Sequence, residues 1–191
     1  MFPIEAFRTT LEKIIGILQA YQIRFHLTGG VTSIVYGEPR MTQDLDIVID
    51  NEALARQLHS FIKSLQDSDF LFDEAALRRA VDHKQMFQLL DSAEALKLDV
   101  YPREMIPGEL DRSDVIELFD GLSVPIASLP DAAISKLIWI SKGSHKNRRD
   151  LRQLIRIATK SQHKTIDQLA ISLGLDILLS EVLAESDEID I

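Results

Sequence analysis

Two aspartates that alternate with aliphatic residues are the feature of this sequence best suited to chemistry. Asp44 and Asp46 flank Leu45, in a run that continues with Ile47. In a strand, residues two apart point to the same face, so both carboxylates project together while Leu45 and Ile47 face the core. Paired carboxylates bind hard divalent cations. The spacing therefore predicts a metal site on one face of a strand.

A third carboxylate would complete such a site, and Asp99 is the candidate. Polar and apolar residues alternate through Lys97–Tyr101, so a strand here would direct Asp99 to the active face and bury Leu98 and Val100. Two ions of Mg²⁺ or Mn²⁺ on such acids can activate an attacking oxygen and stabilise a departing pyrophosphate.

Two glycines upstream suit a phosphate group. Gly29 and Gly30 separate a short apolar strand, Arg24–Thr28, from a short helix. Glycine lets the backbone approach a phosphate closely, and a helix N-terminus offers unpaired amides. Ser33 can add a hydroxyl from the first turn. A glycine pair or an Asp-x-Asp pair alone is common, but the two in this order indicate nucleotidyl transfer.

Other polar and aromatic residues near these segments have two interpretations. Arg40 and Thr42 lie in the loop before the aspartates and either contact the nucleotide or serve as ordinary loop residues. His26, in an apolar strand, favours a structural role over a ligand role. Trp139 and Ile140 favour the core over a base-stacking platform.

The elements that must position these residues are helices and short strands. The expected helices are 3–20, 31–36, one that follows Asp50-Asn51, and others from about Pro130, Asn147 and Thr165; the expected strands are 24–28, 45–49, 70–72, 86–90 and 96–101. The chain is predicted to be α+β, with a mixed sheet in a catalytic core at residues 1–128. Residues 129–191 are predicted to form a helical C-terminal region packed on that core.

Composition narrows the class of protein. The 191 residues are 46% hydrophobic, enough for a full core, and contain no cysteine, which excludes disulfides, zinc thiolates and a cysteine nucleophile. The N-terminus carries charges where a signal peptide needs apolar residues, and no apolar run approaches the roughly 20 residues of a membrane span. We expect a cytoplasmic protein without membrane contact.

The chain is acidic overall but has one basic stretch. Its formal net charge is −9, which would repel nucleic acid over much of the surface. Nine cations lie between Lys136 and Lys164, and they are Lys136, Lys142, Lys146, Arg148, Arg149, Arg152, Arg156, Lys160 and Lys164. This stretch either binds an RNA end, such as that of a tRNA, or forms a solvated helix pair.

The series Gly29-Gly30, Ser33, Arg40-x-Thr42-x-Asp44-x-Asp46 and Asp99 resembles the minimal nucleotidyltransferases of the DNA polymerase beta superfamily. Within it, the chain looks most like the AbiEii-like toxins and their stand-alone relatives. The resemblance implies a nucleotidyltransferase fold. It also implies that Asp44 and Asp46 bind magnesium and that Gly29, Gly30 and Ser33 hold the triphosphate.

The C-terminal half adds a looser likeness to the same family. The segments Leu129–Lys136 and Arg148–Leu151 are similar to its lysine and acidic motifs. The resemblance implies that Lys136 contacts phosphate and that Asp150 supports the site. The alternatives are a solvated helix lysine for Lys136, and a surface ion pair of Asp150 with Arg149 or Arg152.

The expected function is transfer of a nucleoside monophosphate from a nucleoside triphosphate to an RNA or tRNA end or to a protein hydroxyl. As a toxin, the protein would have an antitoxin partner. The alternative is a catalytically silent nucleotide-binding regulator or antitoxin-like partner. A protein that only binds has no need of three metal carboxylates, which argues against that alternative.

Overall fold

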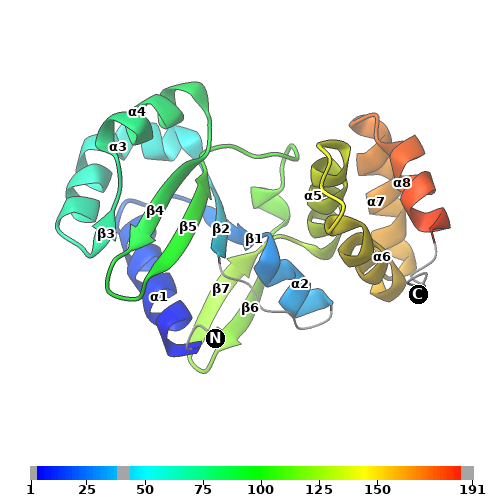
Figure 1. The fold of residues 1–191 in the computed structure, drawn as a ribbon, viewed down its shortest axis with the longest axis horizontal. Coiled ribbons are helices and arrows are strands. Elements are labelled where there is room, and N and C mark those ends of the chain that lie inside the picture. The colour runs from blue at the N-terminus through cyan, green and yellow to red at the C-terminus, as the bar shows by residue number, and fades with distance from the viewer. Residues whose placement is uncertain (1–3, 38–43, 186–191) are drawn as a thin grey trace. The chain divides into compact units, whose positions relative to one another are not determined.

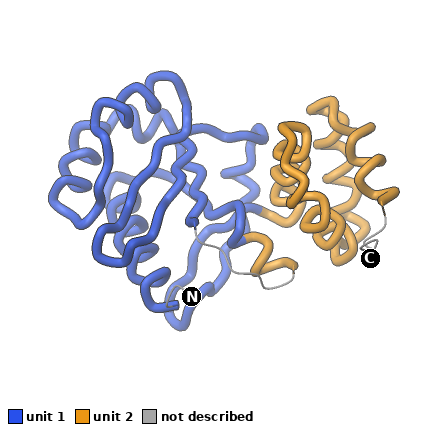
Figure 2. The backbone as a smooth tube through the Cα atoms, viewed as in Figure 1, with its two compact units in different colours: residues 1–31, 41–127 blue, residues 32–40, 128–191 orange. Residues whose placement is uncertain are grey.

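The computed structural model describes residues 4–37 and 44–185. They form an α+β fold, as predicted, which contains eight α-helices, one short 3₁₀ helix and seven strands. By their contacts, the chain divides into two compact units, one built from residues 1–31 and 41–127 and the other from residues 32–40 and 128–191 (Figure 2). The division into a catalytic core at residues 1–128 and a helical region at residues 129–191 remains a prediction.

Unit 1 is built on a seven-stranded mixed sheet with the order β3-β4-β5-β2-β1-β7-β6 (Figure 1). The strands are β1 (Phe25–Thr28), β2 (Asp44–Ile49), β3 (Phe70–Leu71), β4 (Phe87–Asp91), β5 (Leu96–Tyr101), β6 (Asp114–Phe119) and β7 (Leu122–Ile126). The central β2 runs parallel to β5 and antiparallel to β1. This arrangement places the two strands with predicted catalytic acids side by side.

Three longer helices complete unit 1. They are α1 (Ile4–Ala20), α3 (Asn51–Gln66) and α4 (Glu74–His83). Helix α1 contacts α3 and β5, and its buried residues recur at helical spacing, as in Leu11, Ile14 and Leu18. The side chain of Asp50 caps α3 by accepting hydrogen bonds from the amides of Glu52 and Ala53, as its position in the sequence predicted.

Unit 2 is helical. Its long elements are α5 (Leu129–Ser141), α6 (Asn147–Ile157), α7 (Lys160–Ser172) and α8 (Asp176–Ala184). Helix α5 contacts each of the other three. It begins where Ser128 accepts a hydrogen bond from the Asp131 amide, with Pro130 in the first turn as predicted. The short helix α2 (Gly30–Tyr36) starts in unit 1, and its residues from Thr32 belong to unit 2.

Some elements differ from the predicted ones. Helix α4, helix α8 and the hairpin of β6 and β7 were not predicted, and α7 begins at Lys160 rather than at Thr165. Within residues 4–37 and 44–185, no helix combines the length and hydropathy needed to cross a membrane.

A buried carboxylate ties α1 to the hairpin of β4 and β5. Asp91 is fully buried and accepts hydrogen bonds from Thr10 Oγ1 at 2.8 Å and from the Ala93 amide at 3.1 Å. Lys13 Nζ lies 3.1 Å from the same carboxylate. Burial opposes ionisation, but the hydrogen bonds from Thr10 and Lys13 outweigh it and lower the pKa of Asp91 below its ordinary 3.8.

Asp91→Asn is expected to lower the free energy of unfolding by about 2 kcal/mol at pH 7, because Lys13 and Thr10 lose a charged partner. A folded-state pKa below 3.8 means that the ionised carboxylate stabilises the fold above about pH 4, and that this contribution is lost as pH falls through the folded value. The difference between variant and wild type should therefore shrink below about pH 4.

Urea unfolding between pH 3 and pH 7 measures this effect. Asp69→Asn is the matched control, since Asp69 pairs with the same Lys13 at 2.9 Å but its side chain is 57% exposed. The control should change stability by less than about 0.5 kcal/mol. Equal losses in the two variants would contradict the role assigned to Asp91.

Candidate active site

The predicted acids lie on one face of the sheet in unit 1. Asp46 is paired in register with Asp99 on the neighbouring parallel strand, and Asp44 is paired with Lys97. Leu45 and Leu98, which alternate with these residues, are fully buried on the opposite face. The register thus brings together carboxylates that are more than 50 residues apart in the sequence.

Each carboxylate is engaged by a neighbouring side chain. Lys97 Nζ lies 3.4 Å from Asp44 Oδ1 and 3.2 Å from Asp99 Oδ2. The amide of Gln88 donates to Asp99 Oδ1 at 3.0 Å, and the hydroxyl of Tyr101 donates to Asp46 Oδ1 at 3.3 Å. These partners were not predicted, although Lys97 and Tyr101 follow the same alternation as Asp99.

The pKa values of Lys97 and Tyr101 are both raised at this site. Burial lowers the pKa of Lys97, but its hydrogen bond to Asp99 and the nearby acids outweigh burial and raise it. Burial, and then the charges of Asp46 and Asp99, raise the pKa of Tyr101. Lys97 therefore stays a cation and Tyr101 stays a neutral donor at physiological pH.

Gly29 is required at this site by its backbone conformation and by its neighbour. Its φ is +64°, in the left-handed region that favours glycine. A Cβ at this position would lie 2.0 Å from Asp46 Oδ2. The glycine turn and the central carboxylate are thus packed against each other, and a side chain at Gly29 would displace Asp46.

The donor set has the chemistry that Mg²⁺ or Mn²⁺ takes, because all three acids offer hard oxygen ligands on one face. In the described part of the chain, however, no three acidic or histidine side chains are gathered closely enough to hold a metal ion as they stand. The ammonium of Lys97 contacts both Asp44 and Asp99 instead. The residues fit a divalent cation provided that these carboxylates turn from Lys97 toward it.

Three other predicted residues converge in unit 2. Ser33 Oγ donates to Asp150 Oδ2 at 3.2 Å, and Lys136 Nζ lies 3.5 Å from the same oxygen. Lys136 is only 3% exposed and Asp150 is 9% exposed. The interpretation of Lys136 as a solvated helix lysine is therefore wrong, and so is that of Asp150 as a surface residue. The cluster joins α2, α5 and α6.

Arg40 and Thr42 lie outside the described residues. His26 is fully buried, with Nδ1 2.8 Å from Ser113 Oγ and Nε2 3.6 Å from the buried Glu109 carboxylate. Its burial and its Nδ1 contact are those of a structural histidine, as predicted, but Nε2 has no hydrogen-bond partner among the described residues. Ile140 is buried as expected, whereas Trp139 is 36% exposed, with Lys142 Nζ 4.9 Å from its ring centroid.

The basic stretch is not one continuous charged surface. Lys136 and Arg152 are buried, and Arg148 and Arg152 both pair with Glu185. Arg152 also donates to the Val182 carbonyl at 3.4 Å, so it connects α6 to α8. The cations that are exposed are Lys142, Lys146, Arg149, Arg156, Lys160 and Lys164.

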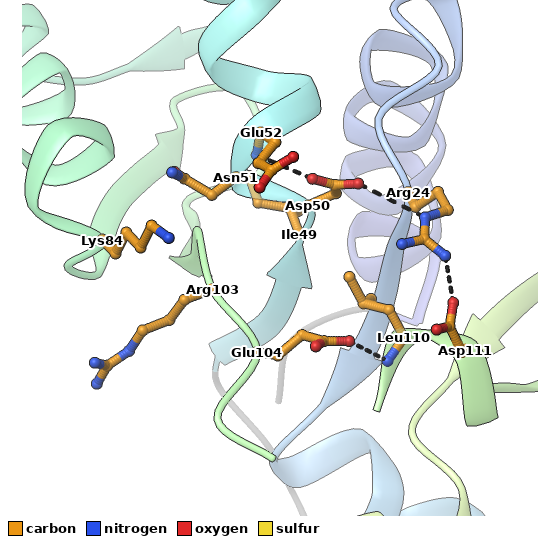
Figure 3. Close-up of a pocket in the computed structure, with 10 residues that line it drawn as sticks. All are labelled: Arg24, Ile49, Asp50, Asn51, Glu52, Lys84, Arg103, Glu104, Leu110 and Asp111. Carbon is orange, nitrogen blue, oxygen red and sulfur yellow. Dashed lines mark hydrogen bonds and ion pairs between the residues drawn. The ribbon is translucent and has the colours of Figure 1, made fainter. Parts of the chain in front are cut away.

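A polar hollow of about 510 Å³ lies at the other end of β2 (Figure 3). It is lined by Arg24, Ile49, Asp50, Asn51, Glu52, Lys84, Arg103, Glu104, Leu110 and Asp111. Arg24 bridges Asp50 at 3.7 Å and Asp111 at 2.5 Å. Asp50 comes four positions after Asp46, which corresponds to about 13 Å along extended chain. The hollow is thus distinct from the carboxylate face.

Comparison with known proteins identifies a family likeness over most of the chain. The family model described as nucleotidyl transferase AbiEii toxin, type IV toxin-antitoxin system, matches residues 16–177. No match is found among curated proteins.

Two solved structures are similar over nearly their whole lengths. An antigenic nucleotidyltransferase-like protein from Paracoccidioides brasiliensis is 16% identical with a TM-score of 0.50, and the match covers 95% of this chain and 94% of that one. The antibiotic-resistance factor ANT(2'')-Ia is 12% identical with a TM-score of 0.50, over 96% and 91% of the two chains. At these identities the likeness shows the fold alone.

Proposed function

We propose a reaction from one premise: this chain belongs to the AbiEii family of nucleotidyltransferase toxins and is a nucleotidyltransferase. The reaction is metal-dependent transfer of a nucleoside monophosphate from a nucleoside triphosphate to an RNA end. One observation carries the proposal. Asp46 and Asp99 are paired on adjacent strands, and Asp44, two residues before Asp46, projects from the same face of the sheet. The toxin of such a system acts beside an antitoxin, which we propose as its partner.

Asp44, Asp46 and Asp99 would hold the cations. When bound, Mg²⁺ supplies positive charge that favours an ionised acceptor hydroxyl and a departing pyrophosphate. The acceptor oxygen forms a bond to the α-phosphorus, and the bond from that phosphorus to the oxygen bridging to the β-phosphate breaks. The hydroxyl proton leaves to solvent. Tyr101, held neutral, keeps Asp46 oriented by its hydrogen bond.

The triphosphate is proposed to bind at the glycine turn. The amides at Gly29 and Gly30 and the hydroxyl of Ser33 can donate to phosphate oxygens, and Lys136 can pair with them as a point charge. Asp150 holds both Ser33 and Lys136 by direct contacts. Arg40 and Thr42 complete the proposed nucleotide-binding residues.

The acceptor is proposed to be an RNA end because exposed cations of unit 2 can neutralise phosphates. Lys160 and Lys164 are exposed and lie one turn apart on α7, so they share a face. Lys160→Glu with Lys164→Glu should weaken transfer of label to tRNA by about tenfold or more at moderate salt. The salt dependence should become shallower as well, while triphosphate binding stays unchanged.

The measurement is transfer from each of the four labelled triphosphates with Mg²⁺, to total tRNA and to lysate protein, at low and moderate salt. Asp167→Lys with Asp176→Lys, on exposed positions of α7 and α8, is the control with added positive charge. Unchanged tRNA labelling in the double-Glu variant would favour a protein hydroxyl as acceptor. No labelling of either acceptor by wild type would leave a binding-only regulator.

A further inference from the structure

Lys97 lies where a metal ion is expected. It occupies the position on β5 that is paired with Asp44 and two residues before Asp99, so its side chain projects from the carboxylate face. Its ammonium contacts both acids, at 3.4 Å and 3.2 Å. The side chain is 37% exposed. The partly solvated ammonium of Lys97 thus lies between Asp44 and Asp99, two of the proposed metal ligands.

Two neutral donors hold two further carboxylate oxygens of the site. Gln88 donates to Asp99 Oδ1, and Tyr101 donates to Asp46 Oδ1. A metal ion would bind oxygens of the same carboxylates, so Lys97 and these donors compete with it for these acids.

We infer that Lys97 is an internal counterion, which neutralises the carboxylate face without metal and has to be displaced before a divalent cation binds. The inference rests on the proposed function, since it assumes that Asp44 and Asp99 are metal ligands. An ion pair as exposed as this one is individually weak, so a doubly charged cation can displace it.

The displaced ammonium needs a new partner, and the substrate can provide one. A bare cation leaves Lys97 facing a site whose negative charge is already neutralised. A cation that arrives with a triphosphate brings anionic oxygens with which the ammonium can pair. Lys97 should therefore oppose binding of bare metal more than binding of the metal with nucleotide, and so favour metal that enters with substrate.

Lys97→Met, which keeps the length of the side chain and removes its charge, tests the inference. Calorimetric titration of the purified chain with Mn²⁺ alone should show binding about threefold to tenfold tighter than wild type. Titration with Mn²⁺ in the presence of a nonhydrolysable triphosphate should show no such gain. Lys97→Arg should resemble wild type with bare Mn²⁺. Lys63→Met controls for net charge, because Lys63 is a surface lysine of α3 that pairs with Asp67, just after the helix.

The possible results separate the inference from the proposed function. Tighter Mn²⁺ binding in Lys97→Met but not in Lys63→Met supports the inference, even where wild-type binding is too weak to measure. Equal or weaker binding in Lys97→Met, with Asp46→Asn abolishing it in both backgrounds, overturns the inference and leaves the metal site. Absence of Mn²⁺ binding in wild type and Lys97→Met alike overturns both.

Discussion

Asp46→Asn is expected to lower the rate of nucleotidyl transfer by about 10³-fold or more, because the central carboxylate of the proposed metal site would lose its charge. The substitution retains the shape of the side chain. The amide oxygen of the new side chain could still accept the hydrogen bond from Tyr101, and the amide fits beside Gly29 as the carboxylate does. The melting temperature without ligand should therefore stay within about 3 °C of wild type.

Two readouts together test the role of Asp46. Mg²⁺ with a triphosphate should raise the melting temperature of wild type by binding linkage, and Asp46→Asn should lose most of that shift. Asp82→Asn is the matched control, since Asp82 is an exposed residue of α4. A full ligand-induced shift in Asp46→Asn would remove the metal site from the proposed function, whatever happened to the rate.

The acids of the candidate site were predictable because their signals are local. Leu45 and Ile47 alternate with Asp44 and Asp46, and a period of two fixes the face whatever the rest of the sheet does. The role of Lys97 was not predictable in the same way. Its contact with Asp44 depends on the register between β2 and β5, which are separated by α3, β3, α4 and β4 in the chain.

Two missed elements did carry local signals. Asp73 caps α4, and Leu77, Ala80 and Val81 follow at helical spacing. Asp120 and Gly121 form the turn between β6 and β7, a pair typical of hairpins, with Gly121 at a φ of +75°. The alternation in β6 is weak because it is an edge strand, and its Val115 is 71% exposed.

The start of α7 was misplaced for a related reason. Thr159 and Gln162 form a reciprocal capping box at the N-terminus of the helix, which begins at Lys160. Apolar periodicity becomes evident only from Ile166, six residues after the helix begins. The polar first turn is stabilised by its cap rather than by burial, so a prediction from hydrophobic spacing begins the helix too late.

Asp150→Leu is expected to cause the largest loss of stability, about 3–5 kcal/mol, because it removes the carboxylate that Lys136 contacts in a buried environment. For a chain of this size the loss corresponds to a fall in melting temperature of roughly 6–20 °C. Asp167→Leu, at an exposed position of α7, is the matched control and should change stability by less than about 0.5 kcal/mol.

The double variant Lys136→Met, Asp150→Leu separates the structural role of Lys136 from its proposed role with the triphosphate. Replacing both members of a buried ion pair with apolar residues is often neutral, so the double variant should recover most of the stability that Asp150→Leu loses. It should bind the triphosphate more weakly than wild type, because Lys136, the cation proposed to contact phosphate, has been removed. Urea unfolding and calorimetric titration with Mg²⁺ and a nonhydrolysable triphosphate measure the two quantities independently. Recovery of both in the double variant would show that Lys136 serves the fold alone and leave Gly29, Gly30 and Ser33 as the phosphate ligands.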